Sequence, residues 1–174
     1  MGVPLRVALY AVHGTRLQSL THPRLMNLKQ HIHSRYLQLV QDRIDALRDM
    51  IGQLTNGAAN DARGSAGDKH QTGLSMMHLE QERLSAKLRE YLDLKAILTK
   101  IDPEASTPHI ALGSLVCANG IWLYVSAALP KITAGDKTVL AISPSSPLGA
   151  QLMGREAGAT CEVQGKSYNV QQVL

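Results

Sequence analysis

The chain has 174 residues, which suffices for one ordinary domain or two small ones but not for a large multi-layer enzyme. Lys and Arg number 18 against 14 Asp and Glu, and the net charge of +4 is too small to indicate a nucleic-acid-binding protein. Phe is absent, and one Trp and five Tyr are the only aromatic residues, which argues against surfaces that stack bases or sugars. No apolar run approaches the roughly 18 residues that a membrane span needs. We therefore expect a cytoplasmic protein that does not contact a membrane.

Residues 1–25 form a basic arm with three Arg and no acid. The apolar stretch at residues 7–12 is not followed by a small-residue cleavage pattern, so it does not resemble a signal peptide. Pro23 breaks the chain shortly before Met26, where a strongly periodic segment begins. We interpret the arm as dispensable, either disordered or untranslated with Met26 as the working start codon. The alternative is a mobile basic tail.

Residues 26 to about 55 predict the first helix. This segment lacks Pro, and its apolar residues recur in steps of three and four, which is typical of one helical face. The polar positions around them, from Lys29 to Asp49, predict a solvated surface of mixed charge. The apolar positions are Ile32, Tyr36, Val40, Ile44, Leu47, Ile51 and Leu54.

A second helix is predicted up to residue 101, where Asp102 and Pro103 end it, because the residue before Pro disfavours the α conformation. Its seam alternates steps of three and four, as a heptad repeat does, with two polar interruptions. The seam positions are Leu74, Met77, Gln81, Leu84, Leu88, Tyr91, Lys95 and Leu98.

Residues 56–73 between the two helices are rich in Gly and small polar residues and cannot contribute to a core. We therefore expect residues 26–101 to form an antiparallel coiled-coil hairpin about 40 Å long with a polar tip. Such a shape is suited to reaching into another molecule. The alternative is a helical hairpin that serves only for dimerisation or packing.

Residues 102–108 contain two prolines and predict a linker, after which residues 109–174 predict a small domain of short strands. Expected strands at residues 110–118 and 121–128 flank Asn119 and Gly120, the strongest short hairpin signal. Further strands are expected at residues 138–142, 160–164 and 167–173, the last two forming a closing hairpin around Gly165 and Lys166.

A short helix is predicted between these strands. Ser146 is suited to be its N-cap, Pro147 suits the first helical position, and Gly154 can end it in the left-handed conformation. The predicted fold class is thus α+β, with an antiparallel sheet and one short helix behind a two-helix coiled coil.

This part of the chain contains no catalytic constellation. Cys117 and Cys161 fall in predicted strands, where a free Cys usually packs as a small apolar residue. A reactive thiol needs a His partner, and no local signature of one is present. His109 stands by itself at the start of a strand, where we expect it on the surface.

The order of these features resembles the bacterial Gre factors, the GreA and GreB transcript-cleavage and elongation factors. The residues that carry the resemblance run Ile-Ser-Pro-Ser-Ser-Pro-Leu-Gly over residues 142–149, followed by Leu-Met-Gly at 152–154 and by Gly158. The resemblance covers about residues 26–174 and leaves residues 1–25 unmatched. It implies a divergent member whose residues 109–174 have an FKBP-like fold.

The resemblance also implies a partner, RNA polymerase. In this family the FKBP-like domain docks at the rim of the polymerase secondary channel, the coiled coil enters the channel, and contact with nascent RNA is indirect. The docking positions carried over are Ser145, Ser146 and Pro147, and Ser145 stands where family members can carry an acid. The expectation is a monomeric accessory factor in transcription elongation, not an enzyme.

The family's tip carries the pattern Asp-x-x-Glu, which helps to hold a second Mg²⁺ shared with the polymerase during cleavage of backtracked RNA. Asp68 matches the first acid, whereas the neutral Gln71 stands at the second position. We therefore expect cleavage stimulation to be weakened. Asp68 has a second interpretation, because Ser65 and Asp68 have the spacing of a capping box.

Three alternative functions stay open. A chain that occupies the channel without stimulating cleavage would act as an inhibitor of RNA polymerase. The FKBP-like half raises the possibility of a peptidyl-prolyl isomerase, although such pockets are lined by aromatic residues and this half has only Trp122, Tyr124 and Tyr168. The third alternative is a coiled-coil adaptor, against which the polar seam residues Gln81 and Lys95 argue.

Overall fold

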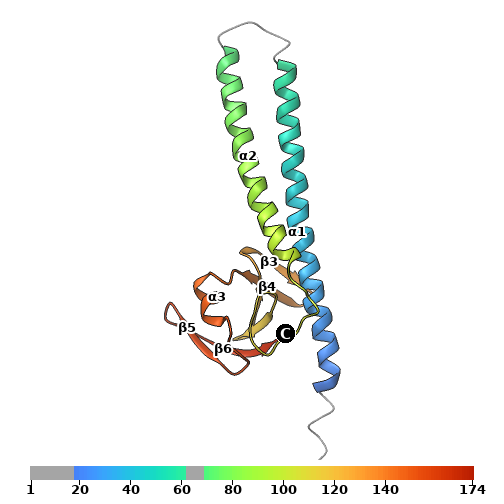
Figure 1. Cartoon of the computed structure of the whole chain (residues 1–174), viewed down its shortest axis with the longest axis vertical. Coiled ribbons are helices and arrows are strands. Elements are labelled where there is room, and N and C mark those ends of the chain that lie inside the picture. Colours follow the sequence, from blue (N-terminus) through green and yellow to red (C-terminus); the bar gives the residue numbers. More distant parts are fainter. Residues whose placement is uncertain (1–17, 62–68) are drawn as a thin grey trace, which may run out of the picture.

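The computed structural model describes the backbone of residues 18–61 and 69–174 and the side chains of residues 28–57 and 73–174. Two long helices, α1 (Gln18–Asp61) and α2 (Lys69–Thr99), run side by side, and a sheet domain packs against their base (Figure 1). At 1.5 Å per residue, the 44 residues of α1 span about 66 Å and the 31 residues of α2 about 46 Å. No helix within the described ranges is both long and apolar enough to cross a bilayer.

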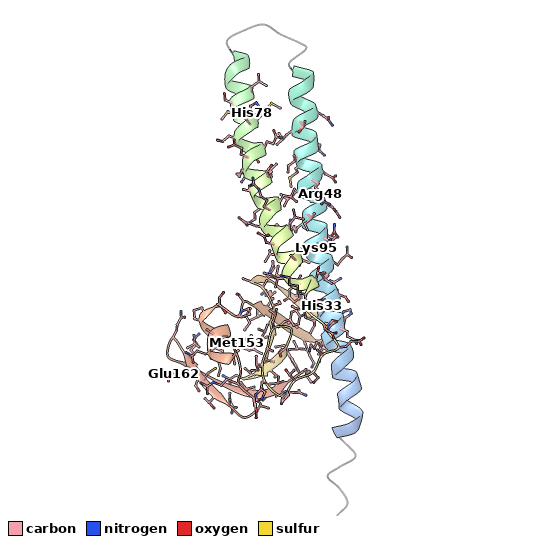
Figure 2. The ribbon with its side chains drawn as sticks, in the orientation of Figure 1. His33, Arg48, His78, Lys95, Met153 and Glu162 are labelled. Atoms are coloured by element: carbon pink, nitrogen blue, oxygen red, sulfur yellow. The ribbon has the colours of Figure 1, made fainter. Side chains whose placement is uncertain are left out.

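The predicted coiled-coil seam is confirmed on both helices. Every predicted apolar position of α1 and every predicted seam position of α2 is buried or half-buried. Burial is complete near the sheet, at Ile32 and Leu98, and becomes partial toward the tip, at Leu54 and Leu74. The polar seam residue Lys95 is accommodated because its Nζ donates a hydrogen bond of 2.6 Å to Gln41 Oε1 on the facing helix. Figure 2 shows Lys95 on α2, in the part of the hairpin close to the sheet.

The first helix is longer than the sequence predicted. It begins at Gln18 and continues through Pro23, so residues 18–25 of the expected arm belong to α1, while residues 1–17 lie outside the described part. Proline inside a helix removes one hydrogen bond, and this one lies close to the N-terminus, where few backbone bonds are affected. The helix also extends to Asp61, beyond the expected end near residue 55.

The sheet has six strands in the order β3-β4-β2-β1-β6-β5, namely β1 (Leu115–Ala118), β2 (Ile121–Val125), β3 (Leu129–Ala134), β4 (Lys137–Ile142), β5 (Thr160–Val163) and β6 (Lys166–Val173). The α+β class is confirmed, but the sheet is mixed and not wholly antiparallel, because β2 and β4 pair in parallel. The sequence prediction omitted β3, which forms a hairpin with β4 and thereby reverses the direction of β4 relative to β2. Pro130 obscured this strand, and it is tolerated there because β3 is at the sheet edge.

Local turn signals were interpreted correctly. Asn119 and Gly120 have φ of 50° and 75° and join β1 to β2, as their sequence predicted. The closing hairpin turns at Gln164 and Gly165, with φ of 53° and 75°, one residue earlier than predicted. The short helix α3 spans Pro147–Leu152 with Ser146 as its N-cap, and Gly154 follows it with φ of 74°.

The two faces of the sheet bury two separate apolar clusters. One cluster joins Leu115, Tyr124 and Val139 to the base of α1 and the end of α2. The other packs Val116, Leu123 and Val170 beneath α3 and includes Cys161. Cys161 is therefore core filling as predicted, whereas Cys117 is only half-buried and its Sγ lies 3.3 Å from Gln171 Oε1.

Candidate functional site

The base of α1 is joined to the sheet by aromatic and polar contacts. The ring of Tyr36 stacks on that of Tyr124 on β2, with a centroid distance of 5.8 Å and an interplanar angle of 6°. Tyr36 Oη donates to the Val139 carbonyl at 3.2 Å, and His33 Nδ1 lies 2.7 Å from Tyr124 Oη. Figure 2 shows His33 on α1 beside the sheet. Together these contacts fix the direction in which the hairpin leaves the sheet.

Burial alters the pKa of each group at this junction. It raises the pKa of Tyr36 to about 12, and it also raises that of Tyr124, with a further contribution from Tyr36. Burial, together with the nearby charge of Lys29, lowers the pKa of His33. The two tyrosines thus stay protonated, Tyr36 as the donor to the Val139 carbonyl, and a neutral His33 is favoured.

The prediction that Lys29 lies on the solvated surface is wrong. The Lys29 side chain is buried, and Nζ donates a hydrogen bond of 2.6 Å to the Ala105 carbonyl in the linker. Desolvation lowers the pKa of Lys29, opposed by the charge of Asp102. Lys29 and His33 precede Tyr36 and Val40 in steps of four, three and four. They therefore continue the apolar stripe, and this was the signal that could have identified them.

Of the two predicted tip residues, only Gln71 belongs to an element that the structure describes. Asp68 lies outside the described residues, and only the backbone of Gln71, in the first turn of α2, is described. The end of α1 and the start of α2, which flank them, lie at the end of the hairpin away from the sheet (Figure 1). In the described ranges, no group of three or more His, Cys, Asp or Glu side chains is arranged to hold a metal ion.

The predicted docking residues Ser145, Ser146 and Pro147 lie at the start of α3 and differ in exposure and hydrogen bonding. Ser146 Oγ accepts a hydrogen bond from the Gly149 N–H at 3.1 Å and donates one to the Ser143 carbonyl at 2.7 Å, so this hydroxyl is engaged within the fold. Ser145 and Pro147 are exposed. A side chain at position 149 would collide with the Ser143 carbonyl oxygen, which explains why Gly149 ends the Ser-Pro-Leu-Gly run.

The aromatic residues that an isomerase pocket would need do not gather in one place. Trp122 and Tyr124 pack in the cluster on the helix side of the sheet, whereas Tyr168 packs in the cluster beneath α3. This division argues against the peptidyl-prolyl isomerase alternative. His109 is on the surface, as predicted, with its Nδ1 3.0 Å from Glu156 Oε1.

Comparison with known proteins finds a structural likeness. No protein-family model matches the chain, and a search of curated proteins gives no significant match. Among solved structures, the crystal structure of the GreA factor homolog 1 (Gfh1) protein of Thermus thermophilus is similar, with 18% identity and a TM-score of 0.31 over 79% of this chain and 94% of that chain.

Proposed function

We propose that the protein is a Gre-like regulator of transcription elongation that binds RNA polymerase through its sheet domain and inserts the hairpin tip into the secondary channel. The Gre-like assignment is supported by the order of helical hairpin, proline-containing linker and sheet domain, and by the Ser-Pro-Leu-Gly run at residues 146–149. The observation that carries the proposal is the hairpin itself, which projects from the sheet (Figure 1). The sequence at the outer ends of its two helices is polar.

Two grooves lie between the base of the hairpin and the sheet domain, and the helix residues that line them mark where the projecting part of the hairpin begins. Ala46 on α1 and Lys87 on α2 are the outermost helical residues that line these grooves. Beyond them, residues 47–61 of α1 and 69–86 of α2 span about 22 Å and 27 Å. A pair of helices this narrow and this long fits a channel better than it encloses a substrate.

Docking would use the exposed residues at the start of α3. Ser145 and Pro147 are accessible to a partner, while the bonded Ser146 and the close-packed Gly149 hold their backbone in place. Docking residues on a fixed loop lose little conformational freedom on binding, which favours affinity.

The tip would contribute ligands to a metal ion held mainly by the polymerase. Carboxylate and amide oxygens are ligands that Mg²⁺ accepts, so Asp68 and Gln71 suit such a role by their chemistry. When bound, the ion supplies Lewis-acid stabilisation of the cleavage reaction. Because Gln71 brings no negative charge, we propose that cleavage stimulation is weakened and that channel occupancy is the main effect. Occupancy without any cleavage is the inhibitor alternative.

Docking is tested by a pull-down of core RNA polymerase with the full chain. Ser145→Arg places a long cation on the docking surface and is expected to weaken the binding. Ser167→Arg introduces the same change at another exposed position, on β6, and is the matched control. If neither the parent chain nor the control retains polymerase, the proposed partner is wrong.

The tip is tested by RNA cleavage in stalled, backtracked complexes. Gln71→Glu is expected to raise Mg²⁺-dependent cleavage, because a second carboxylate binds the ion more strongly than an amide. Gln53→Glu makes the same charge change at an exposed position of α1 and is expected to leave cleavage unaltered. An unchanged cleavage rate in Gln71→Glu at every Mg²⁺ concentration, with binding intact, would reject this role of the tip.

A further inference from the structure

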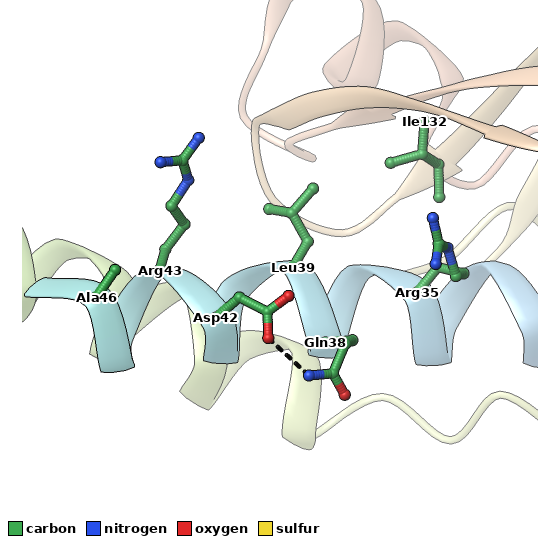
Figure 3. Close-up of a pocket in the computed structure, with 7 residues that line it drawn as sticks. All are labelled: Arg35, Gln38, Leu39, Asp42, Arg43, Ala46 and Ile132. Carbon is green, nitrogen blue, oxygen red and sulfur yellow. Dashed lines mark hydrogen bonds between the residues drawn. The ribbon is translucent and has the colours of Figure 1, made fainter.

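A groove of about 390 Å³ lies between α1 and the edge strand β3, apart from both the tip and α3. Its helical wall carries Arg35, Leu39 and Arg43, and Ile132 of β3 forms the opposite wall. Figure 3 shows the three helical side chains projecting on the side where Ile132 and the sheet lie. The groove thus places the apolar side chains of Leu39 and Ile132 between two cations, and Gln38, Asp42 and Ala46 complete its lining.

The spacing of the helical residues defines a linear pattern. Arg35, Leu39 and Arg43 follow one another at four-residue intervals, which places them on one face of α1. Each interval advances about 6 Å along the helix axis, so the two arginines are about 12 Å apart. The groove therefore presents a cation, an apolar side chain and a cation in even succession.

Both arginines are available to a ligand. Each is exposed, and within the described ranges neither makes a hydrogen bond or an ion pair, whereas Arg48 and Arg83 pair with neighbouring acids. The acid that also lines the groove, Asp42, accepts a hydrogen bond of 2.7 Å from Gln38 on the adjacent flank (Figure 3). Leu39 is half-buried and Ile132 is 9% exposed, so the floor and wall between the cations are apolar.

The chemistry of the groove selects its ligand. A guanidinium pairs bidentately with a carboxylate or a phosphate. A nucleic-acid backbone would present phosphates alone, and it would leave the apolar wall between the arginines without an apolar partner. An acidic protein segment can satisfy both arginines and also bury an apolar side chain between them. Charge and apolarity together favour the protein segment.

We propose that this groove binds an extended acidic segment of a partner protein with the pattern Glu-x-Leu-x-Glu. Alternate residues of an extended chain point to one side about 6.7 Å apart, which matches the intervals from Arg35 to Leu39 and from Leu39 to Arg43. We expect the segment to be bound through its side chains and not by backbone pairing with the edge strand β3. Pro130 in β3 lacks an N–H, and the pairing of β3 with β4 shifts register between Leu129 and Ile132, so β3 is a poor template for another strand. Binding here does not require RNA polymerase, so it can be measured on the full chain alone.

The test is fluorescence anisotropy with a labelled peptide whose core is Glu-Ala-Leu-Ala-Glu. The double variant Arg35→Gln/Arg43→Gln is expected to weaken the affinity by about tenfold or more, since it removes two charge-assisted contacts. The double variant Arg48→Gln/Arg89→Gln makes the same charge change at exposed positions elsewhere on the hairpin and is expected to bind almost as the parent does. Circular dichroism verifies that both variants are folded.

Three further probes discriminate the alternatives. A peptide of the same composition with the core Glu-Leu-Ala-Ala-Glu and one with the core Gln-Ala-Leu-Ala-Gln are both expected to bind more weakly. Equal binding of the rearranged core, or equal losses in the two double variants, would overturn the proposal in favour of unspecific charge attraction. A short single-stranded RNA that binds through Arg35 and Arg43 where the peptide does not would overturn it in favour of a phosphate ligand.

Discussion

His33 sits where its neutral form is favoured over its charged form. Its ring is buried between α1 and the sheet, with Tyr124 in hydrogen-bonding distance and the Lys29 cation nearby. Burial and like charge both lower the pKa of His33 in the folded protein below that of the unfolded chain, which is about 6.5. The residue thereby links the stability of the helix–sheet junction to pH.

The direction of this linkage follows from the lowered pKa. As the pH falls below about 6.5, the unfolded chain binds a proton at His33 before the folded protein does, so the free energy of unfolding decreases. We expect urea denaturation to show lower stability at acidic than at neutral pH, and His33→Gln to reduce the difference. His31→Gln, at an exposed position of the same turn, is the control. A pH dependence that is equal in the two variants would contradict the assignment to His33.

At the scale of elements, α3 depends on one serine hydroxyl. Ser146 Oγ connects the first turn of this six-residue helix to the Ser143 carbonyl, and Ser146 is also the N-cap. A helix this short has little internal stability, so its ends determine whether it forms.

Ser146→Ala is expected to destabilise the protein by about 1 kcal/mol, which is the usual cost of removing an N-cap side chain. Denaturant unfolding measures this loss. Ser145→Ala, one residue earlier, removes an exposed hydroxyl that bonds only to Ser143 Oγ, and it should alter stability much less. Comparable losses in the two variants would show that the cap does not stabilise α3.

Elements defined by local chemistry were predictable from the sequence, and those defined by distant partners were not. The seam of the hairpin, the Asn119-Gly120 turn and the cap of α3 each follow from spacing or from one residue's conformational preference. The edge strand β3 carries Pro130, and its identity depends on pairing with β4. Lys29 was predicted on the solvated surface, and the contact that buries it, with the Ala105 carbonyl, comes from a residue far away in the sequence.

The same distinction applies to the candidate sites. The Ser-Ser-Pro run indicated the start of α3 directly, although only the structure separates the bonded Ser146 from the exposed Ser145 and Pro147. Arg35 and Arg43 looked like ordinary solvated charges in the sequence. They become a candidate site only because β3, which was not predicted, supplies the opposite wall of the groove.

At the scale of the whole molecule, the sheet domain with the base of the hairpin and the outer part of the hairpin are structurally separate. The contacts between the hairpin and the sheet are concentrated at the base, where the apolar cluster and the hydrogen bonds of His33 and Tyr36 lie, and Lys29 adds a hydrogen bond to the linker there. The outer helices pack only on each other in a seam of declining burial. The length of the hairpin can therefore be changed without disturbing the sheet domain.

Deleting residues 47–53 and 81–87 together is expected to shorten the hairpin by about 10 Å. Each deletion is one heptad, so the seam keeps its register. Leu54 takes the position of Leu47 on α1, and Met77 takes that of Leu84 on α2. The hydrogen bond between Lys95 and Gln41, closer to the sheet, is retained.

If the sheet domain anchors the protein and the tip acts inside the channel, the shortened chain should still be retained by core RNA polymerase. It should lose whatever effect the full chain has on RNA extension or cleavage, because the tip no longer reaches its target. Circular dichroism and thermal unfolding establish that the shortened hairpin folds. Loss of polymerase binding by a folded variant would mean that the outer hairpin is the anchor. If the shortened chain keeps its full effect on transcription, the length of the helices is not needed to bring the tip to its target.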